Sequence, residues 1–288
     1  TMVVIGGGVI GLELACAYAA FGTKITVVEA MDHMLPMLDG DLTKIGVAHM
    51  KKMGMAFNLE CPVQAVEASP VGAKVVCKNK AGETVSFEAE KVLVAIGRKA
   101  NTASLNLEAA GLANDRGRII VNDKMETSVP GVYAIGDVIG PRRIMLAHMA
   151  VAEAHTAVHN ILHPEDRKAQ RYDVVPSAIF TAPEIGDVGL SEAQAKQQGF
   201  AVKTSVFQFR ELGKAQAMGE LAGLFKLVVE EGSGKLLGAH IAGAHASDLI
   251  AEATLAIQRG CTARDLFETI HAHPTLSEGI YEAAGSLV

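Results

Sequence analysis

Cysteines are few in this 288-residue sequence: it has four, Cys16, Cys61, Cys77 and Cys261, and none forms a Cys-x-x-Cys pair. The spacing excludes the usual zinc-site patterns and leaves no disulfide framework. A reducing compartment is therefore the default expectation. Cys16 lies in an apolar stretch typical of a helix, and we expect it to be a small core residue.

Long apolar runs and an excess of positive charge are also missing. No apolar run is long enough to cross a bilayer, and the net charge of −6 argues against nucleic acid or anionic membranes as partners. The 288 residues, 49% of them hydrophobic, suffice for two or three domains with their own cores. Thr1 leads almost directly into an apolar strand-like run. The absence of a targeting peptide is therefore uninformative, and we expect the chain to be part of a longer protein.

A glycine-rich motif, GGGVIG at residues 6–11, follows the short apolar run 2–5 and precedes an apolar-periodic segment. A strand, G-x-G-x-x-G and a helix in this order are typical of a dinucleotide-binding domain. Gly6 would permit the tight turn, Gly8 the approach of a pyrophosphate, and Gly11 the close packing of helix on strand. The N–H groups at the helix start would bind the phosphates.

An acidic residue, Glu29, ends a second predicted strand at 24–28, 18 residues after Gly11. A carboxylate at this place accepts hydrogen bonds from the adenosine ribose hydroxyls and repels a 2′-phosphate. No arginine lies between Thr23 and Arg98, so no guanidinium is near in sequence to neutralise such a phosphate. The sequence therefore predicts NAD rather than NADP as the nicotinamide cofactor.

The remainder of the first 97 residues continues this α/β pattern. We expect a helix at 39–52, then short strands up to residue 88 with a hairpin turn at 79–82, and a buried strand at 91–96. Together these elements predict an NAD-binding domain over residues 1–97.

Residues 98–164 carry a different signature. After a strand at 118–121, the segment 127–137 predicts a polar turn and an apolar strand that ends at Gly136-Asp137. An aspartate at the carboxyl end of a strand can accept hydrogen bonds from a polyol, and a loop residue that caps the next helix is the alternative. Leu146-Ala147-His148 then begins a long helix whose N-terminus can face an anionic ring oxygen.

From about residue 165 the pattern predicts an α+β module, in which strands are followed by helices on one face. Ser191 and Gln194 match a capping box. The apolar face of the helix 247–259 can be internal core or a partner contact, and we favour partner contact for the C-terminal segment as a whole. The predicted strands are 177–180, 184–189, 202–209, 223–230 and 236–242, and the predicted helices are 191–198, 247–259 and 262–270.

Near the C-terminus the segment HAHPTLSEG, residues 271–279, combines two histidines with proline, serine and glutamate. Pro274 keeps His273 out of helical geometry. Ser277 is then expected to cap a short helix at 279–284. A tight turn between the histidine and the helix follows from this arrangement.

The turn lets Glu278 reach back to the imidazole of His273. A histidine oriented by a carboxylate has a fixed tautomer and can serve as general acid or base. The alternative is a surface histidine beside a capped helix. His271 has no comparable partner within sequence reach, which favours His273 as the base.

These blocks, in this order, resemble the pyridine nucleotide–disulfide oxidoreductases, and within them most closely the dihydrolipoamide dehydrogenases. The resemblance covers essentially the whole chain. It implies an α/β fold with a Rossmann-like NAD domain at 1–97, the second half of an FAD domain at 98–164, and an α+β dimerisation domain at 165–288. It rests on VAIGR at 94–98, the segment 127–137, MLAH at 145–148, PSAIFTAPE at 176–184 and HPTLSE at 273–278.

The resemblance implies FAD and NAD as cofactors and no metal. It places Gly97 in the segment between the two cofactor domains and Asp137 at the ribityl chain of FAD. Leu146, Ala147 and His148 would meet the flavin pyrimidine edge, and Glu13 would lie near the nicotinamide pocket.

His273 and Glu278 resemble the catalytic dyad of the family. The implied activity is oxidation of protein-bound dihydrolipoamide by NAD⁺ through an enzyme disulfide and FAD, with His273 taking the proton across a homodimer. A thiolate, not a thiol, attacks a disulfide, so the reaction needs a base. The implied partner is the lipoyl domain of a 2-oxo-acid dehydrogenase complex, in the cytoplasm or, in a eukaryote, the mitochondrial matrix.

Two family features that precede the NAD domain are missing: a first G-x-G-x-x-G for FAD and a Cys-x-x-x-x-Cys redox pair. They correspond to about one domain of roughly 100–200 residues, so the isolated chain is expected to be inactive and to bind FAD poorly. The alternatives are a glutathione or mercuric reductase, a flavin transhydrogenase, or a non-catalytic NAD-binding, dimerising fragment. The LAH segment and Glu29 disfavour a glutathione reductase, and a C-terminus without cysteines disfavours a mercuric reductase.

Overall fold

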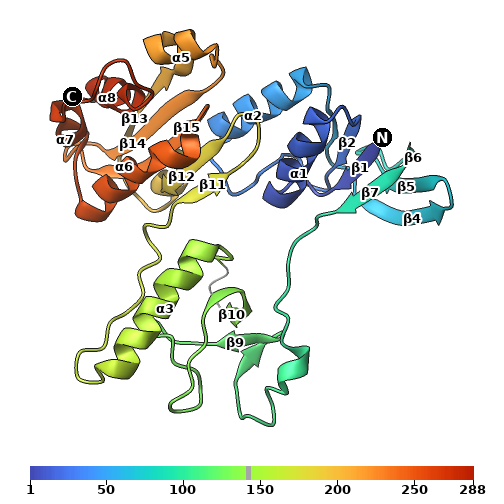
Figure 1. The fold of residues 1–288 in the computed structure, drawn as a ribbon, viewed down its shortest axis with the longest axis horizontal. Coiled ribbons are helices and arrows are strands. Elements are labelled where there is room, and N and C mark those ends of the chain that lie inside the picture. The colour runs from blue at the N-terminus through green and yellow to red at the C-terminus, as the bar shows by residue number, and fades with distance from the viewer. Residues whose placement is uncertain (141–143) are drawn as a thin grey trace. The chain divides into compact units, whose positions relative to one another are not determined.

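The computed structural model describes residues 1–140 and 144–288. They form two compact units: Thr1–Gly97 together with Pro176–Val288, and Arg98–Val175 (Figure 1). Among the described residues, no helix is long and apolar enough to cross a membrane.

A four-stranded parallel sheet in the order β3-β2-β1-β7 organises the N-terminal part of the first unit. Parallel neighbours require crossover connections, and the helices α1 and α2 supply two of them. The predicted nucleotide-binding α/β fold is confirmed. Its elements are β1 (Met2–Ile5), α1 (Val9–Ala20), β2 (Ile25–Val28), α2 (Gly40–Lys52), β3 (Ala56–Asn58) and β7 (Lys91–Val94).

Both faces of this sheet are covered, because successive side chains of a strand point to opposite sides. Val4 of β1 packs with Leu12 of α1, whereas Val3 packs with Val75 and Cys77 of an antiparallel meander. The predicted hairpin at 79–82 is present within that meander. The three strands of the meander are β4 (Val63–Ser69), β5 (Gly72–Lys78) and β6 (Thr84–Ala89).

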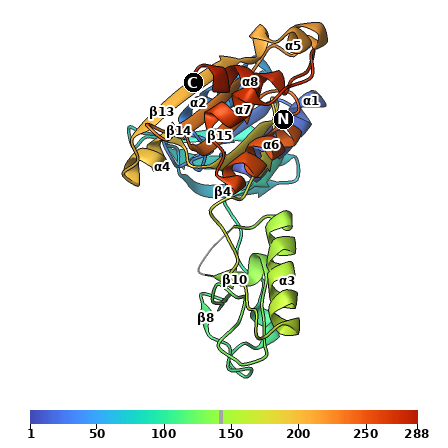
Figure 2. The same cartoon turned by 90° about the vertical axis from the view of Figure 1, so that its left-hand side faces the viewer.

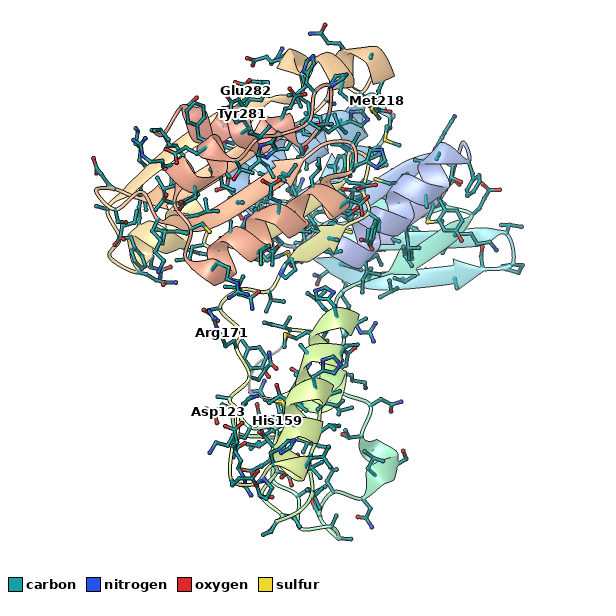
Figure 3. All side chains as sticks on the ribbon, turned by 60° about the vertical axis from the view of Figure 1, so that its left-hand side comes forward. Asp123, His159, Arg171, Met218, Tyr281 and Glu282 are labelled. Carbon is teal, nitrogen blue, oxygen red and sulfur yellow. The ribbon has the colours of Figure 1, made fainter. Side chains whose placement is uncertain are left out.

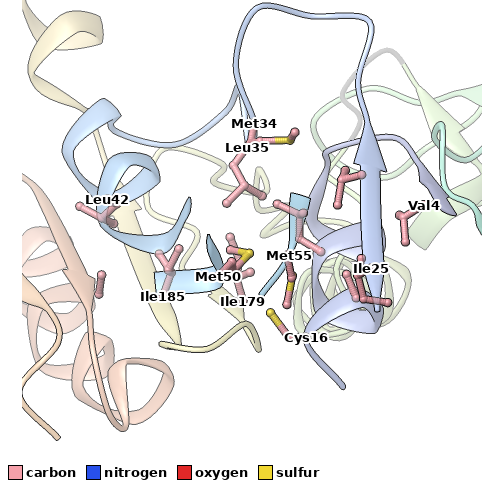
Figure 4. Close-up of a cluster of buried hydrophobic side chains, with 14 of the residues drawn as sticks. Val4, Cys16, Ile25, Met34, Leu35, Leu42, Met50, Met55, Ile179 and Ile185 are labelled. Atoms are coloured by element: carbon pink, nitrogen blue, oxygen red, sulfur yellow. The ribbon is translucent and has the colours of Figure 1, made fainter. Parts of the chain in front are cut away.

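One hydrophobic core joins the nucleotide-binding part to the C-terminal part of the same unit (Figure 4). Leu42 and Met50 of α2 lie in this core with Ile179 and Ile185, which come from the C-terminal sheet. Cys16 belongs to it too and is buried, as predicted. The two sheets are therefore packed into a single unit.

The C-terminal sheet has five antiparallel strands in the order β11-β12-β15-β14-β13. Helices α6, α7 and α8 lie over one face (Figure 2), which confirms the predicted α+β arrangement. The elements are β11 (Ser177–Ile179), β12 (Ile185–Gly189), α4 (Glu192–Gln197), β13 (Val202–Gln208), a 3₁₀ turn (Phe209–Glu211), α5 (Gly213–Met218), β14 (Leu224–Glu230), β15 (Leu236–Ala242), α6 (Ala246–Arg259), α7 (Ala263–Glu268) and α8 (Glu278–Gly285).

The apolar face of α6 is internal core. Ile250 and Ala253 are buried, and a Cβ at Gly186 of β12 would lie only 2.9 Å from the Cβ of Ile250. The capping box of Ser191 and Gln194 at the start of α4 is confirmed. The short helix α5 has no equivalent among the predicted elements.

The second unit combines a small sheet, in the order β10-β9-β8, with one long helix, α3. The strand predicted before Gly136 is wrong. Only Tyr133 is paired there, by an isolated bridge to Glu126, and an extended segment becomes a strand only where a neighbour pairs with it along its length. The elements are two 3₁₀ turns (Ala103–Leu105 and Gly136–Val138), β8 (Asn114–Asp115), β9 (Arg118–Ile120), β10 (Ile139–Gly140) and α3 (Ala147–Leu162).

Candidate functional site

Of the four glycines in the motif, Gly8 is open, and Gly6, Gly7 and Gly11 are crowded. A Cβ at Gly6, where φ is +107°, would clash with the carbonyl oxygen of Ala95, and a Cβ at Gly11 would clash with that of Gly6. A Cβ at Gly8 would meet no atom within 4 Å. Gly8 is also the N-cap of α1, where no side chain caps the helix. Open space beside uncapped helical N–H groups fits a pyrophosphate.

Glu29 lies next to this motif, at the end of β2. Its Oε2 accepts a hydrogen bond from the N–H of Gly7 at 2.6 Å, and its Oε1 accepts one from the N–H of Met31 at 2.7 Å. A carboxylate offers about four acceptor positions, so each oxygen can accept one more donor. The half-buried carboxylate therefore fits two ribose hydroxyls beside the phosphate-binding turn.

Glu13 and Gly97 lie in the same unit as the glycine motif. Gly97 follows β7 with φ at +122°, and nothing lies within 4 Å of an added Cβ. Glu13 of α1 accepts a hydrogen bond at Oε1 from the N–H of Phe180 at 2.8 Å. This contact ties α1 to the residue after β11, and sequence patterns could not predict it because 167 positions separate the two residues.

In the second unit, Asp137 lies in the 3₁₀ turn Gly136–Val138. Its Oδ2 accepts a hydrogen bond from the guanidinium of Arg98 at 2.9 Å, and 40% of its side chain is exposed. Arg118, which is buried, donates to the carbonyl oxygen of Asp137 at 3.3 Å. The carboxylate is thus held by Arg98 yet open on one side, which fits a polyol.

Glu153 of α3 holds the same turn from within the unit. This residue is 2% exposed. Its Oε2 accepts the N–H of Gly136 at 2.7 Å, and its Oε1 accepts the hydroxyl of Tyr172 at 3.0 Å. A hydrogen-bonded carboxylate in a buried place is costly to disturb. Glu153 was not among the predicted site residues, because it lies on a helix whose pattern indicates only amphipathic packing.

The start of α3 packs near this turn, since a Cβ at Gly136 would lie 3.4 Å from the Cβ of Ala150. Leu146 is the N-cap and provides no side-chain acceptor, and no acidic residue follows in the first turn, which contains Ala147 and His148. The structure thus brings Asp137 and residues 146–148 into one region of the second unit, as expected for a flavin site.

At the C-terminus, His273 and Glu278 form the predicted pair. The distance from His273 Nδ1 to Glu278 Oε1 is 2.8 Å. Glu278 Oε2 accepts the N–H of Thr275 at 2.8 Å. These two contacts, the Thr275 N–H first and the His273 side chain second, hold the pKa of the Glu278 carboxyl below its usual range.

The imidazole of His273 is 75% exposed, whereas the side chain of Glu278 is 19% exposed. Because an ionised carboxylate only accepts hydrogen bonds, Nδ1 is the donor. The lone pair of neutral His273 is then on Nε2. The arrangement presents a base to a reactant from outside.

The predicted cap by Ser277 is wrong. Its backbone already has helical angles, φ −64° and ψ −22°, and its side chain makes no capping bond. An N-cap residue needs an extended backbone to accept from the first turn. The Ser277 hydroxyl instead lies 2.9 Å from that of Thr275.

Beyond the sequence reach considered above, His271 does have a partner. Its Nε2 lies 2.9 Å from Oε1 of Glu252 on α6, and its Nδ1 lies 2.8 Å from the carbonyl oxygen of Thr269. Glu252 is 19 positions upstream, outside the reach of local pattern reasoning. Exposure distinguishes the two histidines, because the His271 side chain is 6% exposed and the His273 side chain is 75% exposed.

Thiol–disulfide exchange requires a thiolate, and two of the four cysteines are buried thiols with raised pKa values. Burial raises the pKa of Cys16, and burial next to Cys61 raises the pKa of Cys77 to about 12. All four are free. Within residues 1–140 and 144–288, no group of three His, Cys, Asp or Glu side chains could hold a metal ion.

Comparison with known proteins identifies the family. Residues 1–154 match the pyridine nucleotide-disulphide oxidoreductase model, and residues 175–284 match the dimerisation domain of the same family. The dihydrolipoyl dehydrogenase of Halobacterium salinarum is 43% identical over 99% of this chain and 59% of its own length. That of Geobacillus stearothermophilus is 42% identical over 99% of this chain and 60% of its own length.

Solved structures agree with these matches. LpdA from Mycobacterium tuberculosis has a TM-score of 0.89 at 28% identity, over 100% of this chain and 61% of that one. The HOCl-induced flavoprotein disulfide reductase RclA from Escherichia coli has a TM-score of 0.90 at 26% identity, over 99% of this chain and 64% of that one. The chain thus spans about 60% of the length of these relatives. With its glycine motif and its C-terminal sheet, it belongs to the pyridine nucleotide-disulphide oxidoreductases.

Proposed function

We propose that this chain is part of a flavin-dependent dihydrolipoamide:NAD⁺ oxidoreductase. The observation that carries the proposal is the exposed imidazole of His273, held at Nδ1 by a carboxylate with a lowered pKa. The dihydrolipoyl dehydrogenases among its relatives, about 40% identical, support the same activity. We propose the NAD-binding domain at 1–97, the second half of the FAD domain at 98–164, and the dimerisation domain at 165–288.

In the dithiol step, His273 Nε2 takes the proton from one thiol of dihydrolipoamide. The resulting thiolate attacks a disulfide sulfur, a new sulfur–sulfur bond forms, and the other sulfur leaves as a thiolate. The second thiol of dihydrolipoamide, once deprotonated, attacks the substrate sulfur of this mixed disulfide, which closes the lipoamide disulfide and releases the remaining sulfur as a thiolate. Glu278 stabilises the imidazolium and keeps the ring in place. The chemistry that FAD supplies when bound is transfer of the electron pair from the reduced disulfide to NAD⁺.

Binding of the two cofactors falls to separate groups of residues. Gly6, Gly8, Gly11 and Glu29 would hold the pyrophosphate and ribose of NAD, with Glu13 near the nicotinamide. Asp137 and the α3 start at Leu146, Ala147 and His148 would hold the ribityl chain and ring of FAD, and Gly97 would belong to the cofactor-binding segment that leads from the NAD domain to the FAD domain. Asp137 keeps an acceptor position for a ribityl hydroxyl while Arg98 stays bound.

We propose a homodimer as the working form, because residues 175–284 match a dimerisation domain. His273 would then act on the disulfide of the other subunit. The proposed macromolecular partner is the lipoyl domain of a 2-oxo-acid dehydrogenase complex. The proposed location is the cytoplasm or, in a eukaryote, the mitochondrial matrix.

The 288 residues alone are proposed to bind NAD and to dimerise without turnover. The observation that favours this second function is the state of the cysteines, three of them buried and none paired. A disulfide for the dithiol step would have to come from elsewhere. Flavin absorbance of the purified chain tests this, since bound FAD in a one-to-one ratio contradicts the expectation of poor flavin binding.

The activity itself is tested by NADH formation in the FAD-loaded holoenzyme. We expect dihydrolipoamide with NAD⁺ to support turnover, and glutathione or NADP⁺ in their places to support much less. We expect the preference for dihydrolipoamide because His273 is placed as the base for a dithiol. We expect the preference for NAD⁺ because the Glu29 carboxylate would repel the 2′-phosphate of NADP⁺. Faster turnover with glutathione would contradict the proposed substrate.

Replacing Glu29 by alanine is expected to weaken NAD binding. The change removes hydrogen bonds to a charged group, worth roughly 1.5–3 kcal/mol, or about 10–100-fold in affinity. Titration of the chain with NAD measures the loss. Glu67→Ala, at an exposed carboxylate of β4, is the matched control and should leave the affinity unchanged. Equal binding of NAD and NADP by the unmodified chain would show that the assignment is wrong.

A further inference from the structure

The loop between α7 and α8 is fixed on both sides of His273. On the downstream side, Glu278 accepts hydrogen bonds from His273 and from the N–H of Thr275. On the upstream side, His271 connects the loop to Glu252 of α6. The hydroxyl of Thr275 also donates to the carbonyl oxygen of Ala272 at 2.7 Å, which closes the turn that contains His273 and Pro274.

The upstream contact joins the His271 side chain, which is 6% exposed, to the Glu252 side chain, which is 34% exposed. His271 Nδ1 faces the Thr269 carbonyl oxygen at 2.8 Å, and Nε2 faces Glu252 Oε1 at 2.9 Å. Both partners are acceptors, so the two hydrogen bonds exist together only when both ring nitrogens carry protons. Hydrogen bonds between an imidazolium and a carboxylate are strong and directional.

The surroundings of His271 suit this charge. Glu252 faces it from α6, and the ring of Tyr281 on α8 lies 5.9 Å away, centroid to centroid. A carboxylate and an aromatic ring are thus neighbours of a side chain that is 6% exposed.

We propose that Glu252 and His271 are positioning residues for His273. They hold the start of the loop on α6, so that the His273 ring stays against Glu278. Without the Glu252 carboxylate, the buried ring of His271 keeps at most a neutral acceptor, and a hydrogen bond to a neutral group is weaker than one to a charged group. The loop then shifts, and the shift reaches His273 through Ala272. This proposal rests on the proposed role of His273 as base.

Nitrogen NMR of the histidine rings in the 288-residue chain tests the positioning directly. In the unmodified chain, neutral His273 should carry its proton on Nδ1, because Glu278 accepts there. In Glu252→Gln, which keeps the side-chain size, the proton should shift toward Nε2, the tautomer that free imidazole side chains favour. His271→Asn, a second route to the same loss, should give the same shift. Glu282→Gln, an equal change of charge at an exposed position of α8 (Figure 3), should leave the tautomer unchanged.

A kinetic measurement on the FAD-loaded holoenzyme tests how the position of His273 affects the dithiol step. Glu252→Gln should slow reduction of the flavin by dihydrolipoamide about 5- to 30-fold, less than the roughly 100-fold that a 1 Å misplacement can cost. The loss should be in the rate constant rather than in KM, since no substrate contact is removed. Reduction of the flavin by NADH should not change.

The outcomes separate the two proposals. A folded Glu252→Gln variant with the Nδ1–H tautomer and an unchanged dithiol rate overturns the positioning role, even where His273→Gln abolishes the reaction. If His273→Gln leaves the dithiol rate intact, the proposed base is wrong, and the tautomer shift still decides whether Glu252 orients the ring. If thermal melting shows that Glu252→Gln does not fold, the tautomer and the dithiol rate of His271→Asn test the positioning role instead.

Discussion

His273→Gln is expected to lower NAD⁺-dependent oxidation of dihydrolipoamide in the holoenzyme by about 10²–10⁴-fold, the usual effect of removing a positioned base. Glutamine occupies similar space and can still donate to Glu278, but it cannot take a proton from a thiol. The His273 side chain is 75% exposed, so the change leaves no cavity. Steady-state turnover measures the loss, and an unchanged melting temperature shows that the fold is intact.

Two neighbouring substitutions serve as references for this prediction. Glu278→Gln should cost less than His273→Gln, because the amide keeps an acceptor oxygen for Nδ1 while the charge that stabilises the imidazolium is lost. His271→Gln should also cost less, because its ring is buried and acts only through the loop. A His271→Gln variant as damaged as His273→Gln would refute the assignment of the base.

Lys226→Met is expected to destabilise the chain by about 3–5 kcal/mol, the usual cost of breaking a buried ion pair by removing one partner. Lys226 of β14 is 4% exposed, and its Nζ lies 3.0 Å from Asp39 and 2.8 Å from Asp41 at the start of α2. Glu192 of α4 is 3.3 Å away. The substitution leaves Asp39, itself 5% exposed, as a buried charge without its cation. Urea unfolding of the chain measures the difference.

Lys44→Met is the matched control for Lys226→Met. The Lys44 side chain is 79% exposed, and exposed substitutions usually change stability by less than about 0.5 kcal/mol. Combining Lys226→Met with Asp39→Asn and Asp41→Asn should recover part of the loss, since no unpaired charge remains. Equal stability of Lys226→Met and Lys44→Met would show that the cluster does not stabilise the fold.

The same cluster predicts an acid dependence. The Lys226 ammonium holds the pKa of the Asp41 carboxyl below its ordinary value of 3.8. The unfolded chain therefore binds its proton at a higher pH than the folded chain does. The stabilisation is complete above that ordinary value and is lost as the pH falls through the lower folded-state pKa. Unfolding free energies between pH 7 and pH 3 should fall less steeply in Lys226→Met than in the unmodified chain.

Much of the candidate site could be predicted because its parts are local in sequence. Gly6, Gly8 and Gly11 lie within one turn and helix start, and their backbone roles follow from spacing. Glu278 is five positions from His273, so the turn at Pro274 brings the two side chains together. Periodicity also indicated the alternation of strands and helices.

Other contacts could not be predicted, because they depend on how distant elements pack. Lys226 and Asp39 are 187 positions apart, and Glu252 meets His271 only because α6 lies beside the last loop. Local patterns describe neighbours two to four positions away. Ser277 shows the opposite limit: its residue type suits a cap, but Glu278 takes the N–H of Thr275, and the Ser277 backbone is already helical.

The central claim is that His273 is the base of a dithiol step. It is tested most directly by rapid mixing of the oxidised holoenzyme with dihydrolipoamide without oxygen, with flavin absorbance as the signal. The account predicts that His273→Gln slows this half-reaction by about 10²–10⁴-fold and leaves flavin reduction by NADH at the rate of the unmodified enzyme. Equal rates with dihydrolipoamide in the two proteins, or an equal loss in both half-reactions, would contradict it.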